Sequence, residues 1–144
     1  MSEDAEFVAP DERVLRRIPK APGFYDSDKT PPIQRGAFTP NRNDTDGLSC
    51  FLERLMSIER LIELAAPKPA SELVIVRFLA RDIYDIGLTL RRTFDPGDPP
   101  GHVIIPELNK AAYDIRKSDL RPLMVQLMLM AEKNIVFNGG RLDA

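Results

Sequence analysis

The chain has one cysteine, one histidine and no tryptophan among its 144 residues. A lone cysteine, Cys50, cannot close an internal disulfide, so the fold does not depend on an oxidising compartment. One histidine and one cysteine also fall short of the ligands that a structural zinc site needs. The sequence therefore predicts no metal site.

The chain also lacks a strong charge of either sign and any long apolar run. Its 20 basic and 22 acidic residues leave a net charge of -2, which argues against a nucleic-acid partner. No apolar stretch reaches the roughly 18 residues needed to cross a bilayer. Residues 1–14 lack the basic start and apolar run of a signal peptide. We therefore expect a cytoplasmic protein with no membrane partner.

What is present is typical of a globular protein, with 43% apolar and 29% charged residues. We expect an acidic tail and an extended proline-rich arm over residues 1–40, followed by a single α+β domain over 41–144. Five prolines and two glycines between residues 19 and 40 predict turns rather than a helix. An arm of this length without regular structure usually has a function or lies on a partner.

An amphipathic helix is predicted over residues 49–65. Apolar side chains recur there at steps of three and four and form one stripe: Leu48, Phe51, Leu52, Leu55, Ile58, Leu61 and Ile62. Asp46-Gly47 predicts a turn before it, and Ser49 is placed to cap its first turn. A helix N-terminus also attracts anions, which leaves a binding loop as the alternative.

The other elements are short. Strands are expected at 14–18, 73–78, 88–90 and 102–105, and a two-turn helix that Gly87 ends. Helices are expected at 107–117 and from Pro122 to about residue 134, followed by a last short strand. These elements predict an α+β fold: a small mixed or antiparallel sheet packed against the amphipathic helix and the C-terminal helices.

The candidate chemical groups are few. His102 is the natural general acid or base, because its ordinary pKa lies near neutrality. The alternative is a structural histidine bonded to backbone at a strand edge. Cys50 with His102 forms a second possible nucleophile and base pair. Arginines suit phosphate recognition, although a paired Arg16-Arg17 also fits a solvated surface.

The segment from Pro122 to residue 134 is apolar on several sides, and Met124 and Met128 belong to it. Flexible thioethers suit irregular cores and also adaptable binding surfaces. This segment is therefore either a core helix or, with the proline-rich arm, a surface for a protein partner or for self-association.

Four segments resemble a group of small bacterial proteins of unassigned function: "LRRIP", "FTPNRNDTDGLS", "VIVRFLARDIYDIGLTL" and "PPGHVIIPEL". They occur in this order and span about two thirds of the chain. The resemblance implies that the following residues form one feature in space: Arg17, Phe38, Asp46, Gly47, Ser49, Gly101 and His102.

The same order is distantly similar to small toxins with an ADP-ribosyltransferase fold. In those toxins a basic strand, a "G-x-S" element and a later polar residue line a nicotinamide-dinucleotide cleft. The resemblance places Arg17, Ser49 and His102 at the matching positions and implies NAD or another nucleotide as ligand. Glu107 is the residue it offers as the catalytic glutamate.

Two functions of different classes follow. The first is a non-catalytic interaction module, an accessory or immunity-like component of a bacterial system without a cofactor. The second is a small nucleotide-directed enzyme or toxin, in which Arg17 grips phosphate, Ser49 holds an anion and His102 is the acid or base. Sequence alone favours the first, because each candidate catalytic group also has a structural explanation.

Overall fold

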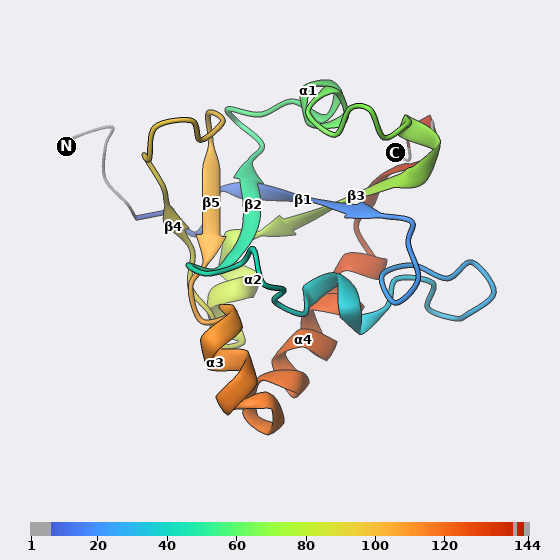
Figure 1. Ribbon diagram of the computed structural model, residues 1–144. Helices are drawn as coiled ribbons and strands as arrows, with labels where there is room; N and C mark the ends of the chain where they lie inside the picture. Colours follow the sequence, from blue (N-terminus) through green and yellow to red (C-terminus); the bar gives the residue numbers. More distant parts are fainter. Residues whose placement is uncertain (1–6, 140, 143–144) are drawn as a thin grey trace.

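An antiparallel sheet forms the centre of the protein (Figure 1). The computed structural model describes residues 7–139 and 141–142, and within them the sheet has seven strands in the order β4-β5-β2-β1-β3-β6-β7. The strands are β1 Arg13–Pro19, β2 Leu48–Leu52, β3 Leu73–Leu79, β4 Arg91–Arg92, β5 His102–Ile105, β6 Ile135–Asn138 and β7 Arg141–Leu142. The expected α+β fold is confirmed, as are the strands expected at 14–18, 73–78 and 102–105.

Helices cover the sheet on both sides (Figure 1). The described α-helices are α1 Ile58–Glu63, α2 Ala80–Asp85, α3 Lys110–Ile115 and α4 Lys117–Glu132, and the 3-10 helices are η1 Arg35–Phe38 and η2 Ala70–Glu72. In Figure 1, α1 lies on one side of the sheet and α2, α3 and α4 lie on the other. We call these sides the α1 face and the α4 face.

Alternation along the strands assigns each residue to a face. Leu15, Phe51 and Ile75 pack with Leu61 of α1 in one apolar cluster. Their strand neighbours, such as Cys50, pack on the α4 face in the larger cluster. This larger cluster receives a stripe from α4 at steps of three and four: Leu120, Met124, Leu127 and Ala131. The α4 helix is therefore a core helix within the chain.

The prediction of one helix over residues 49–65 is wrong. Residues 48–52 form the strand β2 in the middle of the sheet, and only Ile58–Glu63 is helical. A central strand is covered on both faces, so its residues are apolar without alternation. Such an apolar run also contains residues at the spacing of a helix stripe. Ser49 consequently caps no helix, and Ser57 caps α1 by accepting a hydrogen bond from Arg60 N at 3.0 Å.

Three boundaries also differ from the sequence prediction. The strand expected at 88–90 is instead β4 at Arg91–Arg92, while Leu88 and Leu90 are buried in the core. Helix α3 is shorter than the 107–117 expected, and Asn109 caps its start. Helix α4 starts at Lys117, so Pro122 lies inside it rather than at its beginning. Packing of the α4 stripe on the sheet offsets the hydrogen bond that Pro122 cannot donate.

The proline-rich arm packs on its own chain. Ile33 and Phe38 are fully buried in the larger core cluster, and Phe24 and Tyr25 pack against it. The strand β1, which precedes the arm, pairs with β2 and β3. The division expected at residue 40 therefore falls within one packed unit.

Arg16 fastens the arm to the sheet. Its Nε and Nη2 atoms donate to the carbonyl of Ala37 in η1, at 3.0 and 2.7 Å. Its Nη1 atom donates to the carbonyl of Ser49 in β2 at 2.6 Å. Burial lowers the pKa of the Arg16 guanidinium, yet an arginine side chain stays protonated in proteins. Arg16 is thus a structural clamp and not part of a solvated surface pair.

Candidate functional site

Ser49 and His102 meet on the α1 face. His102 of β5 is the antiparallel partner of Phe51 in β2, so its side chain lies on the same face as Phe51 and Ser49. The Ser49 Oγ lies 3.0 Å from His102 Nε2, and the Phe51 and His102 rings pack edge to face at 5.4 Å between centroids. The resemblance brought these two residues together, and the structure shows the contact that joins them.

Two residues that the sequence analysis missed continue this contact. His102 Nδ1 lies 2.6 Å from Thr93 Oγ1, and that hydroxyl donates to Asp98 Oδ2 at 2.6 Å. Both belong to the loop that leads from β4 into β5. The available signal was their position: a hydroxyl and carboxylates shortly before the chain's one histidine.

The hydrogen-bond donors and acceptors in this series of side chains fix the tautomer of His102. An ionised carboxylate only accepts, so Thr93 gives its one hydroxyl proton to Asp98. The Thr93 oxygen then accepts from Nδ1–H of His102, which leaves Nε2 unprotonated in the neutral ring. Ser49 therefore donates its hydroxyl proton to Nε2. We call these four residues the Ser49 relay; it joins a serine hydroxyl to a base that is held in position.

Burial governs the charge of His102. The side chain is 15% exposed, and desolvation lowers its pKa, although Asp98 and Asp95 act in the opposite direction. The imidazole is consequently neutral at pH 7, as a general base must be.

This lowered pKa makes stability depend on pH. The unfolded chain binds a proton near pH 6.5, while folded His102 binds it only at lower pH. The contribution of His102 to the free energy of unfolding is therefore present above pH 6.5 and is lost as the pH falls through the folded pKa. Urea unfolding of the wild type should show a smaller free energy of unfolding at pH 5.5 than at pH 7.5.

His102→Gln is the control for this pH dependence, because it removes the only histidine. The decrease in the free energy of unfolding between pH 7.5 and 5.5 should be smaller in this variant than in the wild type. An equal loss in both proteins would assign the dependence to other groups and contradict a depressed pKa at His102.

Arg17 lies on the same face as the Ser49 relay. It follows Leu15 by two positions in β1, and both share the α1 face. Its Nη1 atom donates to the carbonyl of Leu61 in α1 at 2.7 Å. Burial, and secondarily repulsion from Arg16, lowers its pKa. The strands that carry Arg17, Ser49 and His102 are neighbours in the sheet, in the order β1, β2 and β5.

Four other residues of the resemblance lie outside the Ser49 relay. Gly47 has φ of +153°, and an added Cβ there would lie 2.6 Å from the carbonyl oxygen of Ile105. Gly101 has φ of +81° and accepts a hydrogen bond from Leu52 N at 2.8 Å. Asp46 is exposed, and Phe38 is buried on the α4 face, opposite Ser49 and His102, so the one feature in space that the resemblance implied does not include Phe38. These two glycines fit the pairing of β2 with β5 that holds Ser49 beside His102.

Two further candidates lie away from the relay. Glu107 follows β5 and accepts hydrogen bonds from the backbone N and the hydroxyl of Thr89, at 2.9 and 2.5 Å. Cys50 is fully buried on the α4 face, opposite the side of the sheet that carries His102. Burial raises the pKa of its thiol to about 11, so the Cys50–His102 pair is excluded as a nucleophile and base.

The two methionines of the expected binding helix differ in position. Met124 is completely buried in the core of the chain. Met128 is partly buried and lines a hollow of about 550 Å³ between α4 and the arm, beside Val125 and Gly36. Only Met128 is placed where an incoming molecule could touch it.

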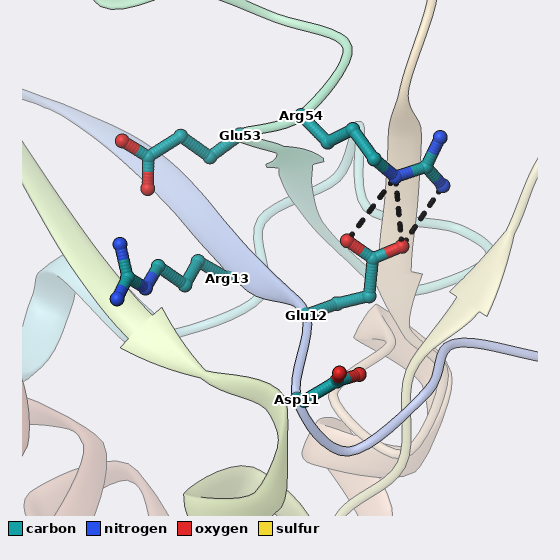
Figure 2. A pocket seen from close by; sticks show the side chains of 5 residues that line it. All are labelled: Asp11, Glu12, Arg13, Glu53 and Arg54. Carbon is teal, nitrogen blue, oxygen red and sulfur yellow. Dashed lines mark hydrogen bonds and ion pairs between the residues drawn. The ribbon is translucent and has the colours of Figure 1, made fainter.

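A charged hollow of about 340 Å³ lies where β1 begins and β2 ends (Figure 2). Arg54 donates to both carboxylate oxygens of Glu12, as the dashed lines in Figure 2 mark. Glu53 accepts from Arg77 at 2.6 and 2.7 Å. These paired charges join three segments of the chain, and we assign the hollow a structural role.

The described residues contain no group of three or more histidine, cysteine, aspartate or glutamate side chains that could hold a metal ion. Across the same part of the chain, no helix has the length and apolar character needed to span a membrane. Searches of protein-family models, curated proteins and solved structures returned no match.

Proposed function

We propose that this protein is a small nucleotide-directed enzyme that uses Ser49 and His102 for catalysis and Arg17 for binding. The observation that carries the proposal is the Ser49 relay, in which an unprotonated Nε2 faces a serine hydroxyl at 3.0 Å. The bond from Nδ1 to Thr93, which in turn donates to Asp98, orients the ring and sets the tautomer that a general base requires.

The place of Arg17 supports a nucleotide as the substrate. The three side chains that the resemblance matches to a nicotinamide-dinucleotide cleft lie on one face and on neighbouring strands. A guanidinium provides the forked donors that suit a phosphate group. Ser49 and His102 then lie one and two strands away from the phosphate-binding residue.

The relay suits cleavage of the N-glycosidic bond of NAD by water. His102 Nε2 takes the hydroxyl proton of Ser49, and Ser49 Oγ takes a proton from the attacking water. The water oxygen bonds to ribose C1′ while the bond to nicotinamide breaks, and nicotinamide leaves as a neutral molecule with the bonding electrons. The released proton remains on His102 until solvent removes it.

The test is release of nicotinamide from NAD, measured by chromatography with the wild type and with His102→Gln. Release by the wild type alone is the expected result. A nucleotide panel followed by thermal unfolding provides a second measurement, because a ligand at 100 times its dissociation constant adds about 2.7 kcal/mol. Absence of both turnover and stabilisation would overturn the proposal.

A second candidate function is a protein-protein interaction module, an accessory component of a bacterial system. The hollow between α4 and the arm favours it, because both elements expected to bind a partner line this one surface. Met128 and Val125 supply adaptable apolar contacts there, and Lys29 and Arg35 supply charge.

Size-exclusion chromatography with light scattering tests this second function. Met128→Glu should abolish self-association or a companion protein's co-purification. Leu129→Glu is the matched control, because Leu129 lies on the same helix and is 49% exposed but does not line the hollow. A strict monomer with no companion, or equal effects of both variants, would contradict the interaction module.

A further inference from the structure

A pocket lined by two cations lies beside α1. It has a volume of about 290 Å³, and its walls are Arg17, Pro19, Leu64, Ala65, Lys68 and Leu73. This volume is near the lower end of small-molecule sites, which begin at about 300 Å³. No acidic side chain of the described residues is among its walls. The pocket therefore has a positive end and an apolar wall.

The charge of this pocket is not neutralised within the described residues. Their ion pairs include neither Arg17 nor Lys68. Arg17 is half-buried, and burial together with the nearby Arg16 disfavours its charged form. A half-buried cation without a carboxylate partner is stabilised by an incoming anion.

Arg17 also has the geometry to receive an oxyanion. Its Nη1 atom donates to the Leu61 carbonyl at 2.7 Å, which restrains the guanidinium. A guanidinium has five N–H donors, so donors remain for a forked contact with two oxygens. Lys68 is exposed at the pocket and adds a mobile positive charge.

We propose that Arg17 and Lys68 bind a phosphate group of the ligand, with an adjoining part of that ligand against Leu64, Ala65 and Leu73. This inference deepens the proposed function, on which the identity of the whole ligand rests. It assigns Lys68 as a binding residue that neither the sequence nor the resemblance indicated. Phosphate binding itself needs no catalysis and is measured separately.

The experiment is calorimetric titration with ADP-ribose, adenosine and inorganic phosphate. ADP-ribose should bind, inorganic phosphate should compete with it, and adenosine should bind at least about tenfold more weakly, since it lacks the charged contacts. Lys68→Gln and Arg17→Gln should each weaken the binding of ADP-ribose about tenfold or more. Arg17→Lys should restore part of this loss, because it keeps the charge but not the fork.

Lys133→Gln is the matched control, since Lys133 is exposed on the described surface but lies at the end of α4, away from the pocket. If Arg17→Gln does not fold, the exposed Lys68 carries the test alone. Equal affinity of Lys68→Gln and the wild type, or equal binding of adenosine, would overturn the assignment. ADP-ribose binding by His102→Gln without turnover supports both proposals, whereas turnover of NAD without an effect of Lys68→Gln would refute only this one.

Discussion

Replacing Arg16 with methionine should lower the free energy of unfolding by roughly 3–5 kcal/mol. Methionine fills much of the space of the arginine stem but donates no hydrogen bond. The carbonyls of Ala37 and Ser49 then lose three contacts from a charged donor. Because these contacts join η1 to β2, the arm should also become sensitive to proteases.

Urea unfolding at pH 7.5 measures this effect, with Arg13→Met as the control on the same strand. Arg13 is exposed, whereas Arg16 is clamped between the arm and the sheet. Arg13→Met should change the free energy of unfolding by no more than about 0.5 kcal/mol. A loss below about 1 kcal/mol for Arg16→Met would mean that water replaces the clamp at little cost.

The contrast between Arg16 and Arg17 illustrates what the sequence could not reveal. Adjacent residues of a strand point to opposite faces, so one arginine of the pair holds the arm and the other faces α1. The sequence contains the pair but not the identity of the element that covers each face. Two solvated arginines and a pair in which one arginine clamps two elements have the same sequence.

Elements bounded by strong local signals were predicted correctly. The run at 73–78 is β-branched, and Gly87 has the positive φ of 94° that ends the helix before it. The helix expected over 49–65 had no such boundary inside it. The turn after β2 and the cap at Ser57 decide where the strand stops and α1 starts, and the apolar stripe concealed both.

The Ser49 relay was predictable only in part. Ser49 and His102 are 53 positions apart, and no spacing rule joins them; the resemblance did. Thr93 and Asp98 reach His102 because the loop before β5 folds back on its own strand. That return depends on tertiary packing, which local sequence does not encode.

His102→Gln should reduce the turnover of NAD by about 10²–10⁴-fold, the usual contribution of a positioned general base. Ser49→Ala should cause a loss of similar size, because its hydroxyl is the group from which Nε2 takes the proton. Neither variant should change the affinity for ADP-ribose as strongly as Arg17→Gln. The measurement is kcat and KM from initial rates of nicotinamide release.

Glu107→Gln separates the relay from the role that the resemblance gives to a glutamate. Glu107 is bonded to Thr89, and its carboxylate contacts no member of the relay among the described residues. Turnover should therefore stay within about twofold of the wild type, as for surface substitutions away from a site. Loss of turnover in Glu107→Gln with retention in His102→Gln would transfer the catalytic role to Glu107.

Thr93→Val tests whether Thr93 and Asp98 position His102 for the reaction. The substitution keeps the shape of the side chain but breaks the link from Nδ1 to Asp98, so the tautomer with an unprotonated Nε2 loses its preference. It should lower kcat more than it changes KM and should shift the acid limb of the pH–rate profile. Adding Asp98→Asn to Thr93→Val should then lower kcat little further, because both substitutions break the same connection. Additive losses, with an unchanged pH profile, would show that the two residues support the loop and not the base.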